Sequence, residues 1–253
     1  MVGEPRHAIV RPPGKAYRQC VSCHPLRDTV DLPLALEQHS RYCEVLSDLG
    51  LEVIRLPPDD SHPDACFVED TAVVFGEKAL ICRMGEPSRR GEEDAVSDLL
   101  GQFVRLRRAA EPATVDGGDV VHLQNRLISG LSRRTNPGGV AAMEDWLGVR
   151  VDTVDSPAMM HLKSHITYLG RGTMVSTEEF AGHPALRDFS VIAVPEDEAY
   201  AVNTLTIRET VIMSHGRDQA HGLVRAAGFE TRTLDMSEFE KCDGALTCLS
   251  LLV

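Results

Sequence analysis

Hydrophobic and polar positions recur along this chain in a pattern that repeats five times. Each repeat begins with a short apolar strand, passes through a polar cluster and enters a second apolar run. The first strands are predicted at 51–58, 103–110, 149–156, 189–196 and 229–236. The second runs lie at 68–75, 115–123, 160–169, 201–209 and 245–253. Self-similarity at a fixed period is typical of repeat architectures.

A third strand is predicted in four of the repeats, at 78–85, 125–132, 172–177 and 209–216. Helical segments follow at 89–103, which has acidic residues in its first turn, and at 138–148, which ends at a C-cap glycine. The last repeat ends at the chain terminus without its third strand or helix. Those pieces are found at the other end, because 6–14 resembles the missing strand and 31–50 is an amphipathic helix.

The two ends of the chain are therefore expected to complete one module and close a ring, which leaves no open sheet edge. The predicted fold class is α/β, a five-module pseudo-symmetric α/β propeller. Residues 1–253 are expected to form a single domain of five repeats of about 45–50 residues.

Composition narrows the choice of partner and compartment. The net charge of −12 disfavours binding to a nucleic-acid backbone and suits a cationic small molecule. The sequence has no apolar run of about 18 residues and no signal-peptide pattern, so no membrane association is expected. Seven scattered cysteines do not resemble a secreted disulfide framework. We expect a cytoplasmic protein with a small-molecule substrate, and a homodimer is possible.

The string from Cys20 to His24 has the C-x-x-C-H spacing that attaches c-type haem. Haem attachment normally takes place outside the cytoplasm, and no export signal is visible. A structural zinc site needs a second close pair of ligands, which the neighbouring sequence lacks. We therefore expect neither a cofactor nor a metal here.

One polar residue in each cluster recurs at about the same spacing of 45 residues: Asp70, Asp116, His161, Asn203 and Cys248. In a closed ring, equivalent loops point toward the axis at the same end, so these side chains should converge. A cysteine with a basic histidine partner is an arrangement for nucleophilic attack. Together with nearby carboxylates, it suits attack on a planar cation such as a guanidinium group.

With these residues, the chain resembles the dimethylarginine dimethylaminohydrolases, a family of the pentein superfamily of guanidine-modifying enzymes. The resemblance is carried by PDACFVEDTAVV, GEPSRRGE, TVDGGDVV, GLSRRTN, MHLKS and KCDGALTCLSLL, which occur in family order over nearly the whole chain. Arginine deiminases have the same fold, but their signatures differ at the positions of HLKS and LTCLS.

The resemblance implies a role for each matching position. Cys248 is the expected nucleophile and His161 the expected general acid and base, with Asp116 as a third catalytic residue. Asp70 and Asp116 are expected to hold the guanidinium nitrogens. The remaining substrate-binding positions are Asp64, Glu69, Arg89, Arg134 and the main-chain carbonyl of Cys242. The two arginines are expected to bind the α-carboxylate by forked contacts.

The expected reaction converts N-omega-methylated arginine to citrulline and dimethylamine or methylamine, through a covalent cysteine adduct and without a cofactor. Two alternatives stay open, namely another guanidine hydrolase such as an arginine deiminase, and a non-catalytic binding protein on the same ring.

The segment 18–28 falls where the family has a flexible lid, with Val21 or Ser22 in place of a leucine. A further hypothesis is that Cys20 and Cys23 form a redox-sensitive pair that locks this lid.

Overall fold

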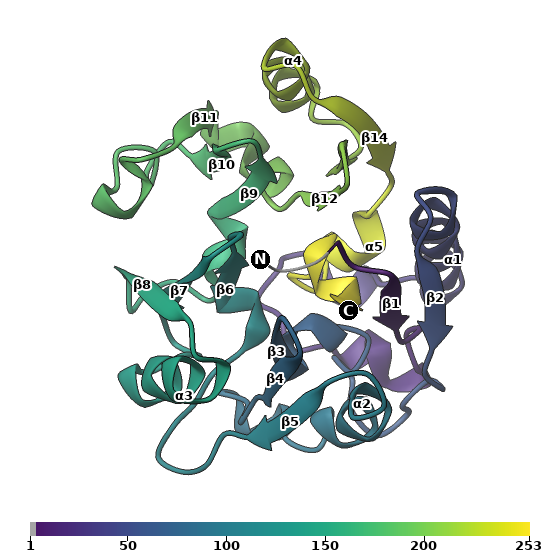
Figure 1. Cartoon of the computed structure of the whole chain (residues 1–253). Coiled ribbons are helices and arrows are strands. Elements are labelled where there is room, and N and C mark those ends of the chain that lie inside the picture. The colour runs from purple at the N-terminus through teal and green to yellow at the C-terminus, as the bar shows by residue number, and fades with distance from the viewer. Residues whose placement is uncertain (1–3) are drawn as a thin grey trace.

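The computed structural model describes residues 4–253 of the chain, and five small sheets surround a common centre in it (Figure 1). Each sheet has three strands, and helices α1 to α4 lie at the outside of the ring. The predicted five-module α/β propeller is therefore confirmed.

The strands are β1 His7–Val10, β2 Glu52–Arg55, β3 Ala72–Phe75, β4 Lys78–Ile81, β5 Arg105–Arg108, β6 Val120–His122, β7 Arg126–Leu131, β8 Arg150–Asp155, β9 Ile166–Gly170, β10 Thr173–Thr177, β11 Ser190–Val194, β12 Leu205–Ile207, β13 Thr210–Ser214, β14 Glu230–Leu234 and β15 Ser250–Leu252. The helices are α1 Leu32–Asp48, α2 Glu93–Leu100, α3 Pro137–Leu147, α4 Asp218–Ala226 and α5 Ser237–Glu240. Every strand predicted above is present, whereas α4 and α5 were not identified from the sequence.

All five sheets share one topology. In four of them the central strand pairs antiparallel with the strand before it in the chain and parallel with the strand after it, as β4 does with β3 and β5. In the fifth, β15 takes the antiparallel place beside β1 and β2 takes the parallel one. A parallel neighbour requires a crossover connection, which α2 supplies between β4 and β5. The grouping drawn from the sequence is therefore shifted by one strand, because each predicted first strand completes the sheet of the preceding repeat.

The two ends of the chain share a sheet. Strand β15 pairs antiparallel with β1, with Ala8 opposite Leu252 and Val10 opposite Ser250, and β1 pairs parallel with β2. This pairing joins the last segment of the chain to the first and so closes the ring of five sheets.

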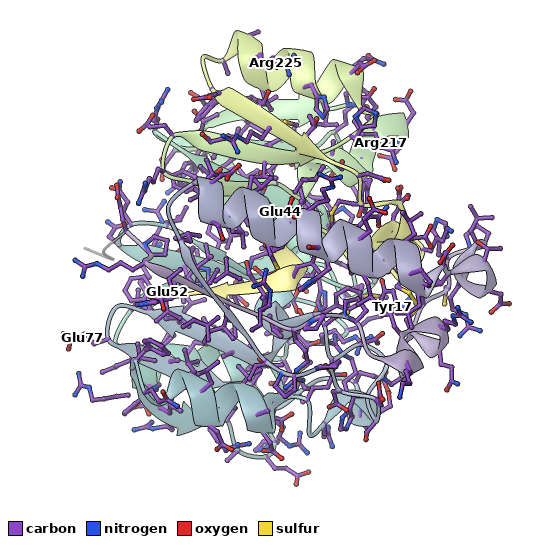
Figure 2. All side chains as sticks on the ribbon, turned by 90° about the vertical axis from the view of Figure 1, so that its right-hand side faces the viewer. Tyr17, Glu44, Glu52, Glu77, Arg217 and Arg225 are labelled. Carbon is purple, nitrogen blue, oxygen red and sulfur yellow. A yellow bond between two sulfur atoms is a disulfide. The ribbon has the colours of Figure 1, made fainter. Side chains whose placement is uncertain are left out.

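Helix α1 illustrates how local sequence fixes a peripheral element. The Asp31 side chain caps it by accepting a hydrogen bond from the Leu34 N–H, which satisfies one of the free amides of the first turn. Its inner face buries Tyr42 and Leu46, while Glu44 lies on the outer face (Figure 2).

Among residues 4–253, no helix combines the length and the apolar composition that crossing a membrane requires.

Candidate active site

The predicted site residues occupy equivalent places in the five modules. Each lies on a short 3₁₀ helix or beside it, just before the strand that pairs antiparallel with the central strand of its sheet, namely β3, β6, β9, β12 or β15. Asp70 lies in the turn Val68–Thr71 and Cys248 in the turn Thr247–Leu249. Asp116 and His161 immediately precede the turns Gly117–Asp119 and Leu162–Ser164, and Asn203 follows the turn Glu196–Val202. Sequence reasoning located these residues but missed the tight turns that aim them toward the axis.

One pocket brings most of the predicted residues together. It is lined by Asp64, Asp70, Arg89, Arg134, His161, Cys242 and Cys248, with Val21, Phe67, Met160, Asp243 and Gly244 completing the wall. Of the predicted set, Glu69 and Asp116 do not line it. The expected nucleophile and the expected acid–base residue thus share one cavity with carboxylates and arginines.

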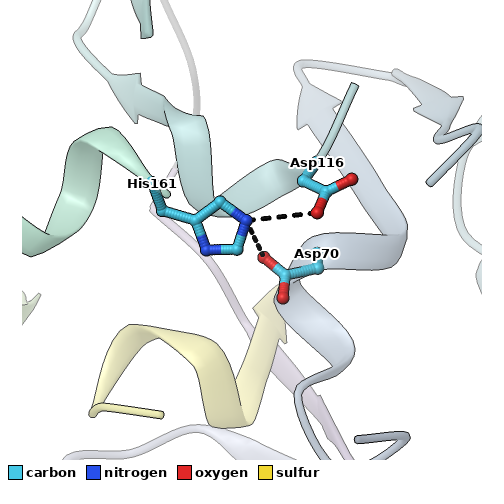
Figure 3. A group of neighbouring side chains, drawn as sticks. All are labelled: Asp70, Asp116 and His161. Carbon is cyan, nitrogen blue, oxygen red and sulfur yellow. Dashed lines mark hydrogen bonds and ion pairs between the residues drawn. The ribbon is translucent and has the colours of Figure 1, made fainter. Parts of the chain in front are cut away.

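His161 lies beside two carboxylates (Figure 3). Its Nε2 is 3.1 Å from Oδ2 of Asp116 and 3.8 Å from Oδ1 of Asp70. Burial acts to lower the pKa of His161, but the negative charges of Asp70 and Asp116, joined by that of Asp119, outweigh it and raise the pKa to about 9. At neutral pH, His161 is therefore an imidazolium that carries a transferable proton.

Asp116 is positioned to orient His161. Its side chain is fully buried, and while Oδ2 faces the imidazole, Oδ1 accepts a 2.8 Å hydrogen bond from the Gly85 N–H. Asp116 does not line the pocket, so the expectation that it holds guanidinium nitrogens stays a prediction. A carboxylate on one imidazole nitrogen fixes the orientation of the ring and favours its charged form.

The double glycine after Asp116 leaves room for this arrangement. A Cβ on Gly118 would lie 2.6 Å from Oδ1 of Asp70 and 2.7 Å from Nδ1 of His161. The Gly118 N–H also donates a 2.9 Å hydrogen bond to that same Asp70 oxygen. Glycine is required here because the backbone itself packs against both functional side chains.

Cys248 is held as a thiol in this pocket. Its side chain is buried, and burial followed by the nearby negative charges of Asp70 and Glu69 raises its pKa well above the ordinary thiol value. A thiolate forms at this position only when a positive charge enters the pocket beside it.

Glu69 stands behind the nucleophile instead of facing the pocket. Its carboxylate accepts hydrogen bonds from Lys163 Nζ at 2.5 Å and from the Thr247 hydroxyl at 2.6 Å. Asn203 holds the same threonine, because Thr247 N–H donates to its Oδ1 at 3.0 Å and its Nδ2 donates to the Thr247 hydroxyl at 3.1 Å. Residues from three other modules, Glu69, Lys163 and Asn203, therefore fix the residue that precedes Cys248, and substrate contact by Glu69 stays a prediction.

The two arginines differ in how far they are already paired. Arg89 donates to Asp70 at 2.7 Å and, through Nε and Nη2, to the Glu92 carboxylate. Arg134 is 8% exposed and its Nη1 has no hydrogen-bond partner, the nearest carboxylate oxygen, on Glu86, being 3.7 Å away. Arg134 thus has an unpaired donor at the pocket, whereas Arg89 is held by carboxylates of the protein.

Asp70, Asp116 and His161 also form the kind of group that binds metals. Their donor atoms all lie within 4.8 Å of one another. Each of the two carboxylates already accepts a backbone hydrogen bond, from Gly118 or Gly85, and the imidazole is protonated at neutral pH. Because a metal needs the neutral imidazole, these donors suit a hydrogen-bonded acid–base cluster better than a metal site.

Val21 of the segment 18–28 lines this pocket, as expected for a lid, but the cysteine chemistry of the segment differs from the hypothesis. Cys20 forms a disulfide with Cys242, and Cys23 is a free, exposed thiol. The proposed Cys20–Cys23 pair is therefore wrong. Pairing across 222 residues could not be read from a C-x-x-C spacing, because it depends on the ring placing the lid beside the loop before Cys248.

Comparison with known proteins agrees with this geometry. Residues 26–215 match the family model of eukaryotic N,N dimethylarginine dimethylhydrolase. A dimethylarginine dimethylaminohydrolase from Streptomyces coelicolor is 36% identical over 97% of this chain and 96% of that protein, and one from Pseudomonas aeruginosa is 32% identical over 97% and 98%.

Solved structures share this fold. The P. aeruginosa enzyme, as a cysteine-to-serine mutant complexed with citrulline, has a TM-score of 0.96 at 31% identity and covers 99% of this chain and 100% of its own. An arginine dihydrolase domain has a TM-score of 0.88 at 19% identity, covering 98% of this chain and 97% of its own, which shows a shared fold. Taken with the FVED, DGGD and HLKS strings around one pocket, these matches show that the chain belongs to the dimethylarginine dimethylaminohydrolase family.

Proposed function

We propose that this protein hydrolyses N-omega-methylated arginines, asymmetric dimethylarginine and monomethylarginine, to citrulline and dimethylamine or methylamine. The observation that carries the proposal is a single pocket in which Cys248, His161 and Asp70 meet. These three residues supply a nucleophile, a charged proton donor and an anion for a guanidinium group. The P. aeruginosa relative was crystallised with citrulline, which is the product expected here.

The substrate cation starts the reaction by changing the protonation of Cys248. Because a positive charge favours thiolate, the bound guanidinium lowers the raised pKa of Cys248 and the thiol proton leaves to solvent. The thiolate sulfur then forms a bond to the guanidinium carbon. Asp70, whose pKa is lowered to about 2 by His161 and Arg89 against the opposing effect of burial, stays ionised and holds the cation.

His161 moves the proton that the leaving amine needs. Its imidazolium protonates the departing dimethylamine as the carbon–nitrogen bond breaks, which leaves a thiouronium adduct on Cys248 and a neutral imidazole. The neutral His161 then takes a proton from water, and the resulting hydroxide attacks the adduct carbon. Collapse of that intermediate breaks the carbon–sulfur bond and expels the Cys248 thiolate, and loss of the hydroxyl proton to solvent releases citrulline.

The amino-acid end of the substrate is assigned to the other side of the pocket. Arg134 has the unpaired guanidinium donor that a carboxylate needs, so we assign the α-carboxylate to Arg134. Asp64 also lines the pocket, and its carboxylate suits the α-ammonium group. We expect Arg134→Lys to raise KM for dimethylarginine with a smaller change in kcat, because a point charge does not reproduce a forked contact.

Citrulline formation by the wild type and by Cys248→Ser tests the proposal. We expect the wild type to release one dimethylamine per citrulline from asymmetric dimethylarginine, and the variant to fold but not turn over. Release of ammonia from arginine at a greater kcat/KM would favour the alternative guanidine hydrolase. Unchanged turnover by Cys248→Ser would remove the cysteine mechanism.

We further propose that the chain is one folding domain in the cytoplasm, acting on a small molecule without nucleic acid or membrane. The shared sheet of β15, β1 and β2 supports a single domain, since neither end completes a sheet alone. Five of the seven cysteines are free thiols, which suits a reducing compartment. A homodimer stays a prediction that light scattering would test.

A further inference from the structure

The lid is attached to the wall of the pocket by a covalent bond. Cys20, in the lid, is bonded to Cys242, which lines the pocket six residues before Cys248. The next lid residue, Val21, also lines the pocket, and its N–H donates to both carboxylate oxygens of Asp64 at 3.2 Å. The disulfide thus joins the two sides of the pocket, one from the lid and one from the loop that leads to the nucleophile.

Apart from this bond and the contact of Val21 with Asp64, the tip of the lid, residues 22 and 23, is held by two polar contacts. The Ser22 hydroxyl donates to the Lys241 carbonyl at 3.1 Å, and the Cys23 N–H donates to the Asp243 carboxylate at 3.3 Å. Val21 is 39% exposed and makes no large apolar anchor. Contacts of this kind break and re-form readily at a surface, so we expect residues 22 and 23 to open locally once the disulfide is reduced.

The residues beneath the lid have little access to solvent while it is in place. Asp64, Asp70, Arg134 and Cys248 are each 8% exposed or less. An arginine-sized substrate can enter, and citrulline can leave, only if part of the pocket wall moves. The disulfide opposes that movement, since it fixes the lid to the wall next to the reacting centre.

We propose that the Cys20–Cys242 bond is a redox site controlling substrate access, closed and slow when oxidised and open when reduced by a small dithiol. The inference rests on the proposed function. A disulfide confined to one pair, in a chain whose other cysteines are free thiols, fits a redox-sensing role better than a structural framework.

The reduction is an ordinary thiol–disulfide exchange. One thiolate of the dithiol attacks a sulfur of the pair, which breaks the Cys20–Cys242 bond and forms a mixed disulfide. The second thiol of the reductant then attacks that mixed disulfide, and the reductant is released as a cyclic disulfide. Two electrons and two protons pass to Cys20 and Cys242, which become thiols. Both sulfurs belong to buried residues, so a small reagent fits this site better than a folded protein.

The experiment compares oxidised and dithiothreitol-reduced protein after the reductant is removed without air, with the state of the bond verified by mass spectrometry. Two rates are measured, alkylation of Cys248 by iodoacetamide and citrulline formation. We expect both to rise roughly ten-fold on reduction, in proportion to the open fraction of the pocket. Cys20→Ser should have the reduced rates in either condition. Cys23→Ser is the matched control, a neighbouring lid thiol outside the bond, and should respond like the wild type.

The two measurements separate failure of this inference from failure of the proposed function. Faster alkylation on reduction with no citrulline in either state supports the redox lid and rejects the methylarginine substrate. Equal rates in verified oxidised and reduced protein overturn the lid inference whatever the substrate is. Greater activity in the oxidised form, or a redox response that persists in Cys20→Ser, also overturns it.

Discussion

His161 and the fully buried Asp116 form a partly buried ion pair, with Nε2 of the imidazole 3.1 Å from Oδ2 of the carboxylate (Figure 3). The two residues lie 45 positions apart in the sequence, at equivalent places in neighbouring modules. The contact shows how the ring assembles the site, because each module supplies one side chain from the turn that precedes the antiparallel outer strand of its sheet.

The first prediction concerns this pair. Asp116→Asn keeps the shape of the side chain but removes its charge, so the imidazole loses a partner that orients it and favours its protonated form. We expect kcat for citrulline formation to fall roughly 10²-fold with little change in KM. Asp155→Asn, at an exposed position of β8, is the control and should leave kcat unchanged. An unaltered kcat in Asp116→Asn would contradict the role assigned here.

The second prediction is the protonation of His161. Nuclear magnetic resonance titration of labelled histidine should give a pKa of about 9, and Asp70→Asn should lower it. His39 provides an internal reference of opposite sign, because burial and then the positive charge of Arg55 lower its pKa to about 4. A His161 pKa near the ordinary 6.5 would refute the proton-donor assignment.

The same shift predicts how stability depends on pH. The folded-state pKa of His161 lies above its unfolded value, so the imidazolium stabilises the fold fully below about 6.5. This contribution is lost as the pH rises through about 9. Urea unfolding at pH 6 and pH 10 should show a decrease that is smaller in Asp70→Asn.

The sequence predicted the positions of the site better than its contacts. Asp70, Asp116, His161 and Cys248 follow from their spacing, because a closed ring brings equivalent turns to one end. The pairing of Arg89 with Glu92 was not predicted, although the two residues are only three positions apart in the sequence. Local spacing alone does not decide whether an arginine faces a protein carboxylate or a ligand.

Contacts that depend on the assembled ring could not be predicted from the sequence. The bond from Cys20 to Cys242 and the hydrogen bond from Thr247 to Glu69 join segments that no local pattern relates. The strand grouping was shifted for a similar reason, since periodicity locates strands but does not say which neighbours they pair with. Pairing is decided by the crossover connections.

The third prediction tests the double glycine beside the catalytic cluster. In Gly118→Ala, the added methyl group would meet Oδ1 of Asp70 at 2.6 Å and Nδ1 of His161 at 2.7 Å, so one of these side chains must move. Displacement of about 1 Å in a catalytic group costs roughly 10² in rate, and we expect a loss of that order in kcat. Gly182→Ala is the control, because no atom lies within 4 Å of its added methyl group. Equal activity of the two variants would contradict the close approach.

The fourth prediction concerns the buried pair of Lys163 and Glu69 behind the nucleophile. Removing the cation in Lys163→Met leaves the Glu69 carboxylate, whose side chain is 12% exposed, without its charged partner, and we expect a loss of about 3 kcal/mol in the free energy of unfolding. Adding Glu69→Gln removes the stranded charge, so the double variant should recover most of that stability. Urea unfolding of both single variants and the double variant measures this coupling. Additive losses would mean that the two side chains stabilise the fold independently, and that Glu69 is not held in place by Lys163.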